Sequence, residues 1–435
     1  MKIRNFLAIT VLSLLITTSL SYGQHDHDHK HDDQTHSHDH GHDHSAHDHG
    51  DHAEGDHDHG ACGGHHGEFQ VGETAMHHIA DANVYSIGPL TIPLPCMLYN
   101  KETGWDIFMS SKFEPAMLGH GDGHKAINKY VLHGGTVKRV TDAAFPMGEV
   151  EIMGFRHGEI EVDGKKKGVS FVCTGDQEYL LDQKSTADGG LFGGGVTSFY
   201  DFSLTKNVTS MLLVCAFLFF MFRGAAKQYK AREGKAPKGV QSLLEVVVVF
   251  LRDEVAKPFL GHKWEKFFPF LLSIFFFILG LNLFGQVPFF GGSNVTGNLG
   301  VTMVLAIIAF IITNINGNGH YWSHLLLAPG VPAFVKPILI PVEVMGIFIK
   351  PLTLMLRLFA NITAGHIVMI VFVGLIFIFG KSGESVGGAM GASVGSTLLT
   401  MFMMAIELIV AFVQAFVFTI LTASYIGAAT EEAHH

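Results

Sequence analysis

Two apolar segments near the end of the sequence constrain the fold more than any other feature. Pro337–Phe379 and Gly388–Ala429 each run for about 40 residues, and a continuous helix of that length would be about 60 Å long. The hydrocarbon core of a bilayer is only about 30 Å thick, so upright spanning helices do not need this length. We therefore expect two membrane helices that are steeply tilted, kinked or broken, with Pro341 and Pro351 as candidate bends.

Three shorter apolar segments have about the length that a bilayer requires. They are Leu204–Phe222, Phe267–Pro288 and Leu299–Asn318. Charged residues make up 16% of the chain, well below the roughly 25% of soluble domains. Gly239–Leu260 mixes apolar and charged residues and is predicted to lie along the membrane surface. The fold class predicted is an all-α polytopic membrane protein with about five membrane helices, one surface helix and a small extracytoplasmic β-rich domain.

The N-terminus has the layout of a secretory signal peptide over residues 1–23. Lys2 and Arg4 precede an apolar run, Phe6–Leu20, that is too short and wrongly flanked for a spanning helix. An uncleaved anchor is the alternative, and both readings place the next segment outside the cytoplasm. The basic loop at 223–238 then marks the cytoplasmic side, so the two signals agree.

Residues 24–66 form a His/Asp-rich tract that holds more than half of the 28 histidines. The tract has almost no apolar residues to offset the loss of chain entropy, so we expect it to be disordered. Its side chains could hold metal ions weakly, or it could be a solvated tail with no fixed role. No histidine pair in it has the spacing of a structural zinc site.

Residues 67–200 are predicted to form a β-rich region. Gly148–Met153 and Glu159–Val162 alternate in polarity as exposed strands do. Asp163–Gly164 is predicted to be the turn of a hairpin whose second strand includes Val169–Val172. The sequence does not indicate what this region does.

Cys96 and Cys173 both lie in the part of the chain that is predicted to be exported. An oxidising compartment permits a bond between Cys96 and Cys173, although their spacing does not demand one. Cys215 falls inside an apolar run and is predicted to be a core residue.

Ionisable residues inside the two long segments indicate function. A charge at mid-bilayer costs at least about 2.5–3.5 kcal/mol and by default marks an ion or substrate path. The side chains of Glu343 and Lys350 could extend to the membrane–water interface. Arg357 suits that explanation poorly, because about 20 residues of the apolar segment lie on either side of it. On a helix of 100° per residue, one stripe holds Glu343, Lys350, Arg357, Asn361 and Ala364, whereas His366 points to the opposite side. Glu407, Gln414 and Tyr425 share a stripe on the last helix.

These residues carry a family resemblance. Pro351–His366, which contains Arg-Leu-Phe-Ala-Asn at 357–361, resembles the arginine helix of the subunit a family of F-type ATP synthases. Gln414–Tyr425 is similar to the last helix of that family, and Asn282–Phe284 with Asn298–Thr302 resembles the preceding hairpin. The resemblance covers residues 204–432, which we predict to be a subunit a membrane domain.

The resemblance implies a function and a role for each residue. Arg357 would face a carboxylate on each passing helix of the rotating c-ring, so that ions cross only by way of the ring. His366, Glu407 and Gln414 would line the periplasmic half-channel and Glu343 the cytoplasmic one, with Asn361 and Gln414 beside Arg357. Residues implied to pack against the c-ring are Leu354, Ala364 and Gly365, small residues at the last two positions allowing close helix approach.

The implied setting is the bacterial inner (plasma) membrane, with a periplasmic N-terminus and a cytoplasmic C-terminus. The expected partners are the c-ring, subunit b and lipid, and the expected ion is the proton, with sodium as second choice. No cofactor, resident metal or nucleic acid is expected. The chain contains no Gly-rich phosphate loop, so it is predicted not to be an enzyme by itself.

This chain departs from the pattern at two points. Some family members have Glu at the first and His at the second of the positions occupied here by His366 and Glu407; the reversal keeps an acid/imidazole pair. That pair could relay protons or could be a mutually satisfied structural contact. Some members also carry acidic residues in the first hairpin, where this chain has Gly285, Gln286 and Asn298, which leaves the lining of the outer vestibule open.

Two other function classes were weighed. A divalent-metal transporter would explain a His-rich exported tail, but His366 has no acid or imidazole four residues away, and Arg357 would repel a divalent cation. A structural membrane anchor would not explain polar residues arranged in stripes on the membrane helices.

Overall fold

The structure is a computed structural model that describes most of the chain after residue 79. Described are residues 80–87, 90–115, 121–162, 165–175, 177–182, 198–231, 233–287, 293–327, 332, 334–380 and 386–431. The predicted signal peptide (1–23), the His/Asp-rich tract (24–66) and the predicted turn at Asp163–Gly164 lie outside these residues.

Residues 80–201 contain the strands and are called the β unit below. All strand pairs in it are antiparallel, in a seven-stranded sheet of order β8-β5-β6-β7-β11-β10-β9, a three-stranded sheet β12-β3-β4 and a two-stranded sheet β1-β2. The elements are β1 (Val84–Ile87), β2 (Leu90–Pro93), β3 (Pro95–Asn100), β4 (Gly104–Met109), the 3-10 turn η1 (Ser110–Phe113), β5 (Lys125–Ile127), β6 (Tyr130–His133), β7 (Thr136–Val140), β8 (Glu149–Glu151), β9 (Gly154–Val162), β10 (Lys165–Thr174), β11 (Gln177–Asp182) and β12 (Tyr200–Asp201).

The predicted hairpin is present, and its strands are longer than the sequence pattern indicated. In β9 and β10, Val162 pairs with Lys165 and Gly158 with Val169. The disulfide between Cys96 and Cys173 that an oxidising compartment would permit is not formed: Cys173 is disulfide-bonded, whereas Cys96 is a free, buried thiol. Burial raises the pKa of the Cys96 thiol to about 12.

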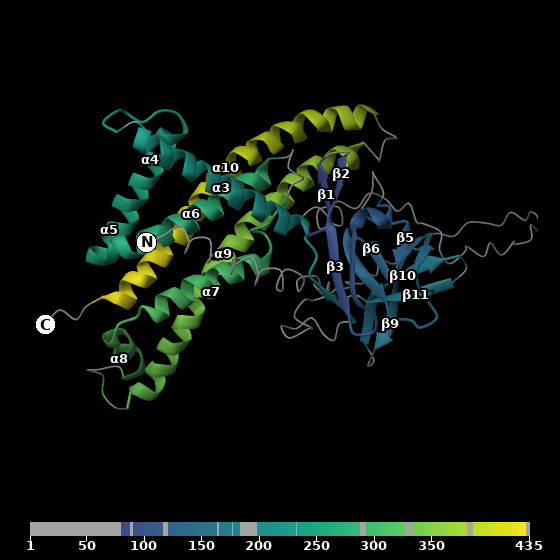
Figure 1. Cartoon of the computed structure of the whole chain (residues 1–435), viewed down its shortest axis with the longest axis horizontal. Helices are drawn as coiled ribbons and strands as arrows, with labels where there is room; N and C mark the ends of the chain where they lie inside the picture. Colours follow the sequence, from purple (N-terminus) through teal and green to yellow (C-terminus); the bar gives the residue numbers. More distant parts are fainter. Residues whose placement is uncertain are drawn as a thin grey trace, which may run out of the picture.

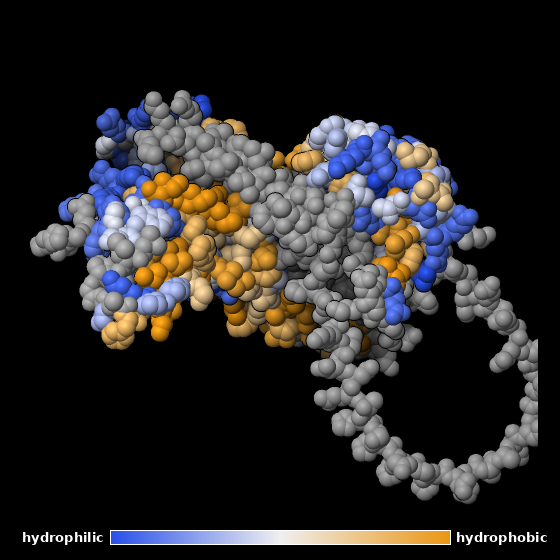
Figure 2. Space-filling model, turned by 90° about the horizontal axis from the view of Figure 1, so that it is seen from below, coloured by the Kyte–Doolittle hydropathy of each residue, from blue (hydrophilic) through white to orange (hydrophobic). Residues whose placement is uncertain are grey.

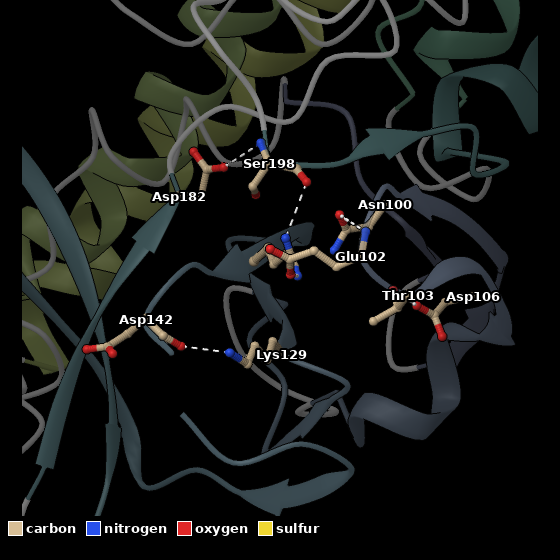
Figure 3. Close-up of polar contacts among 9 residues, drawn as sticks. Asn100, Glu102, Thr103, Asp106, Lys129, Asp142, Asp182 and Ser198 are labelled. Atoms are coloured by element: carbon tan, nitrogen blue, oxygen red, sulfur yellow. Dashed lines mark hydrogen bonds and ion pairs between the residues drawn. The ribbon is translucent and has the colours of Figure 1, made fainter. Parts of the chain in front are cut away.

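A buried arginine ties the sheet to the segment that leads into the helices. Arg139 donates to a carboxylate oxygen of Glu102 at 2.7 Å and to the Ser198 carbonyl oxygen at 3.3 Å. The Ser198 amide in turn donates to Asp182 at 3.0 Å, and Figure 3 shows this chain of contacts. The Arg139 guanidinium holds the pKa of Glu102 below its usual range, which identifies the contact as an ion pair.

Residues 206–431 contain all the α-helices described and are called the helical unit below. The elements are α3 (Lys206–Ala231), α4 (Val240–Phe250), the π-helical turn η2 (Leu251–Ala256), α5 (Lys257–Leu260), the 3-10 turn η3 (Gly261–Lys263), α6 (Trp264–Gln286), α7 (Leu299–Ile315), α8 (Gly319–Leu327), α9 (Lys336–Phe379) and α10 (Val386–Thr430).

The predicted fold class is confirmed. By length and composition, four helical segments could cross a membrane: Lys206–Ala231, Val240–Gln286, Lys336–Phe379 and Met390–Thr430. The fifth predicted span corresponds to α7, which is apolar but shorter. The predicted surface helix corresponds to α4, η2 and α5, whereas the sequence analysis did not anticipate α8.

The two long helices, α9 and α10, lie side by side through the helical unit (Figure 1). Helix α9 is continuous through Pro341 and Pro351. At the end far from the β unit, the Lys263 ammonium donates to the Thr430 carbonyl oxygen at 2.8 Å, and the Asn318 amide donates to the Ala429 carbonyl oxygen at 2.8 Å. These contacts bring the start of α6, the α7–α8 connection and the end of α10 together.

The surface of the helical unit is largely apolar on the face drawn in Figure 2, with polar residues gathered at the end away from the β unit. Phe217 and Phe220 of α3 and Leu398 of α10 are among its strongly exposed side chains. Such a surface needs lipid or another protein against it.

The junction between the units is short and hydrogen-bonded. Strand β12 pairs with β3, and the next residues continue this pairing: the Phe202 amide donates to the Met97 carbonyl oxygen at 2.9 Å, and the Leu204 amide to that of Pro95 at 3.1 Å. Helix α3 begins two residues later, and the Lys206 amide donates to the Ala82 carbonyl oxygen at 2.7 Å. The start of α3 and the residues that lead into it are thus hydrogen-bonded to two parts of the β unit, namely β3 and the segment just before β1.

Candidate ion-translocation site

Helix α9 separates its polar residues onto two faces, as the helical spacing predicts. Leu354, Leu358 and Ile362 recur every four residues and are buried in the core of the helical unit. Arg357 and Asn361 are exposed side chains of the same helix. Lys350 and Ala364 share that exposure, and Glu343 is partly buried. The face that carries Arg357 is therefore the one that α9 does not bury within this subunit.

Helix α10 turns its polar stripe inwards. Glu407 and Gln414 are 6% and 3% exposed, and the small residues Ala411 and Ala415 lie at the spacing that places them on the same face. Small residues at these positions allow α9 and α10 to approach closely.

His366 and Glu407 are brought together at the interface of α9 and α10. His366 Nδ1 lies 3.4 Å from Glu407 Oε1, and both side chains are buried. Gly365 makes room for the carboxylate, since a Cβ atom at that position would lie 2.3 Å from Glu407 Oε1. The backbone of Glu407 is held from the other side, because the Gln286 side-chain amide donates to its carbonyl oxygen at 2.7 Å.

Asn361 and Gln414 form a second polar contact between the same helices. The Asn361 side-chain amide donates to Gln414 Oε1 at 2.7 Å. Because Asn361 follows Arg357 by one helical turn, this bond joins the exposed face of α9 to the buried stripe of α10. The neighbouring Asn282 of α6 donates to the Ala411 carbonyl oxygen at 3.3 Å and extends the polar layer.

A third group lies nearer the end of the helices that is far from the β unit. The Lys350 ammonium is 5.4 Å from the centroid of the Tyr425 ring. Lys350 and Tyr425 line a pocket with Thr313, Asn314 and Tyr321. Glu343 precedes Lys350 by about two turns on α9.

The three residues expected to pack against the ring differ in burial. Leu354 is only 2% exposed and packs in the core of the helical unit. Gly365 faces Glu407 of α10, so its small size serves a contact inside this chain. Ala364 is the exposed member of the three.

Sequence reasoning missed a layer of buried polar residues at the end of the helical unit next to the β unit. It comprises Asn207 of α3 and Ser293, Asn294 and Thr296 before α7, all at most 2% exposed. Thr296 donates to the Asn282 side chain at 2.7 Å. A run of short polar residues between two apolar spans was the available signal, but it reads equally well as an exposed loop. Among the described residues, no three His, Cys, Asp or Glu side chains gather as a metal site requires.

The family is decided by the sequence match over the helical unit. Residues 208–427, which include every polar residue of the α9–α10 interface, match the family model described as ATP synthase A chain. The chain belongs to the ATP synthase A chain family. Residues 74–168, in the β unit, match a second family model described as a domain of unknown function.

Curated relatives agree with the ATP synthase A chain family. ATP synthase subunit a of Chloroherpeton thalassium is 43% identical over 242 residues, which cover 54% of this chain and 69% of the relative. Subunit a 2 of Prosthecochloris aestuarii is 40% identical over 242 residues, covering 54% and 71%. Subunit a of Anaeromyxobacter dehalogenans is 35% identical over 320 residues, covering 71% and 72%, so this alignment reaches beyond the helical unit.

Membership of the ATP synthase A chain family settles the broad function. The chain is a multi-pass membrane protein and the proton-translocating stator subunit of ATP synthase, not an enzyme by itself. It works within that complex beside the c-ring and subunit b. The comparisons give no support to the divalent-metal transporter.

Proposed function

We propose that Arg357 is the charge that separates the two proton half-channels and faces the ring carboxylates. The observation that carries this proposal is the exposure of Arg357 on a face whose neighbours, Leu352 and Leu356, are apolar and exposed as well. A guanidinium on such a face would cost at least about 2.5–3.5 kcal/mol in lipid, so the face fits a protein partner that carries a compensating carboxylate.

The chemistry of such an encounter follows from electrostatics. A fixed positive charge stabilises a nearby carboxylate, so each ring site would release its proton as it reaches Arg357. The same charge repels a proton that moves directly between the half-channels. Arginine suits the role because its guanidinium stays protonated at every physiological pH.

The His366–Glu407 pair is proposed as the relay of the half-channel on the side of the β unit. Imidazole and carboxylate can both take up and release protons, and both groups here are buried at the interface of α9 and α10. The hydrogen bond between Asn361 and Gln414 would hold the next polar groups of the proton path beside Arg357. Glu343, with Lys350 and Tyr425 at the opposite end, is proposed to line the other half-channel.

The proposed orientation places the β unit in the periplasm and the C-terminus in the cytoplasm of the bacterial inner membrane. The basic residues at 223–238, in the last turns of α3 and just after it, support this orientation, because positive charges next to a membrane helix stay on the cytoplasmic side. Lipid would cover the apolar surface that the c-ring and subunit b leave free.

The test replaces Arg357 with Ala and records ATP-driven proton uptake in inverted membrane vesicles, together with a check of complex assembly. We expect an assembled complex with no coupled pumping. The matched control is Arg223→Ala, which removes an exposed arginine at the far end of α3 and should leave pumping near normal. Near-normal pumping by Arg357→Ala would refute the proposed role.

For the His/Asp-rich tract (24–66), which lies outside the described residues, we propose weak buffering of metal ions or protons near the channel mouth. Its density of imidazole and carboxylate groups supports this role. Deleting the tract should alter the dependence of pumping on pH or metal concentration, and an unchanged dependence on both would rule the role out.

A further inference from the structure

A carboxylate from outside the family match lies at the start of α3. Asp81 precedes the first strand of the β unit and is partly buried. Its Oδ1 accepts a hydrogen bond from the Asn207 amide at 3.0 Å and another from the Ala82 amide at 2.9 Å. It therefore satisfies a free N–H group in the first turn of a helix that begins more than a hundred residues later in the chain.

The charged group that faces Asp81 among the described residues is Lys206, the first residue of α3. Lys206 is 7% exposed, so a positive and a titratable negative group meet at the boundary between the two units. Burial raises the pKa of the Asp81 carboxyl, although the hydrogen bonds and Lys206 act in the opposite direction. A carboxyl in this state binds protons at a higher pH than a solvated one does.

Buried polar groups continue from Asp81 towards the proton relay. The Asn207 side-chain oxygen accepts a hydrogen bond from the Ser293 hydroxyl at 3.3 Å. The link to the relay is a close approach at Gly285: a Cβ atom at that residue would lie 2.7 Å from the Ser293 carbonyl oxygen and 3.9 Å from His366 Nε2. Ser293 and His366 thus both approach Gly285, and the absence of a side chain at this residue lets them do so.

Along this route, several buried polar atoms have no hydrogen-bond partner among the residues that the structure describes. The side-chain amide nitrogens of Asn207 and Asn294 are such atoms, and so are both carboxylate oxygens of Glu407. Buried polar atoms in proteins are nearly always paired, and ordered water supplies the pairing where protein groups do not. Water along this layer would join hydroxyl and carboxylate groups that can each donate and accept protons.

We propose that Asp81 is the proton-collecting group at the outer mouth of the half-channel, so that the β unit supplies the first residue of the proton path. From Asp81 the path runs past Asn207 and Ser293, and by the close approach at Gly285, to His366 and Glu407. The proposal rests on the proposed function for its inner end.

The test uses the whole ATP synthase in proteoliposomes, with the β unit facing the lumen, and measures ATP synthesis as the lumen pH is varied at constant ΔpH and membrane potential. The main variant is Asp81→Asn, which keeps an oxygen to accept the two backbone hydrogen bonds. Asp81→Ser is the second, because its hydroxyl can accept a hydrogen bond but carries no carboxyl group. Asp81→Glu retains the carboxyl, and Glu151→Gln on the exposed strand β8 is the matched control.

Without the collecting carboxyl, entry would depend directly on the bulk proton concentration. We expect Asp81→Asn and Asp81→Ser to synthesise ATP at close to the wild-type rate near pH 6 and about tenfold more slowly near pH 8, the low end of what a charged cleft contributes to local ion capture. Asp81→Glu and Glu151→Gln should keep the wild-type profile.

Three results would overturn the proposal: a wild-type profile in Asp81→Asn, a loss that is the same at every pH, or failure of both main variants to assemble. The last two would identify Asp81 as a residue that only holds α3 to the β unit. None of these results concerns Arg357, so the proposed function is tested separately by the pumping of Arg357→Ala.

Discussion

Replacing Gly365 with Ala would test whether the contact between α9 and α10 positions the Glu407 carboxylate. The new methyl carbon would lie 2.3 Å from Glu407 Oε1 and 3.1 Å from its Cγ and Cδ atoms, whereas ordinary contacts are 3.4 Å or longer. The carboxylate must therefore retreat by about 1 Å, because the backbone around residue 365 is fixed by the helix.

The cost to stability should be small. Turning the Glu407 side chain away from its preferred rotamer costs about 0.5–1.5 kcal/mol, and alanine recovers about 1 kcal/mol of helix propensity over glycine. The cost to function should be larger, because a misplacement of about 1 Å in a proton-transfer group can slow a reaction by about 100-fold. His366 Nδ1 is already 3.4 Å from Oε1, so the pair has little tolerance for a shift away from it.

The assay is ATP-driven proton uptake in inverted vesicles, normalised to assembled complex. We expect Gly365→Ala to assemble and to pump at least about tenfold more slowly than wild type, within the range expected for a displaced group. Gly224→Ala in α3, where a Cβ atom would meet nothing within 4 Å, is the matched control and should pump normally. Glu407→Asp removes the methylene that the new methyl would displace, so its defect and that of Gly365→Ala should not add. Pumping by Gly365→Ala within about twofold of wild type would refute the assigned geometry.

Three further predictions concern other contacts. A double-mutant cycle of Gln414→Leu and Asn361→Ala, read by thermal unfolding of the purified complex, should give a coupling of about 1 kcal/mol; additive effects would mean that their hydrogen bond contributes nothing. Because Arg139 lowers the folded-state pKa of Glu102, their ion pair stabilises the β unit above the unfolded pKa of about 4.3 and is lost as pH falls through the lower folded value. The protection of β7 amides against hydrogen exchange, relative to their intrinsic exchange rate at each pH, should therefore fall in acid in the full chain, and less so in Glu102→Gln. Cys96, fully buried and with a thiol pKa raised to about 12, should resist maleimide at neutral pH until the β unit unfolds.

The helical periodicity predicted which residues of α9 face inwards, because an α-helix fixes the direction of each side chain from its position alone. Arg357 and Asn361 lie on the exposed face and His366 is buried, as their angles indicate. Leu354, which the resemblance assigns to the ring surface, lies on the buried face of α9, and a resemblance alone does not indicate which side of the helix a residue occupies.

Contacts between distant segments could not be predicted from one sequence. Asp81 is far from Asn207 in the chain, and no periodicity links a loop before a strand to the first turn of a membrane helix. Short polar residues such as Ser293 are typical of solvated loops. The burial of Ser293 arises where the α6–α7 connection meets the first turn of α3.

Strand β12 determines the order in which this protein can be made. Tyr200 and Asp201 pair with Tyr99 and Leu98 in the centre of a three-stranded sheet, and α3 starts only a few residues after them. During synthesis the earlier strands emerge first, but this sheet lacks an edge until the chain has been made as far as the start of α3. Strand β12 and the first turn of α3 are therefore synthesised almost together. A ribosome that stalls shortly before residue 200 would leave β3 with an open edge, and the quality-control machinery of the membrane would meet an unfinished sheet instead of a folded domain.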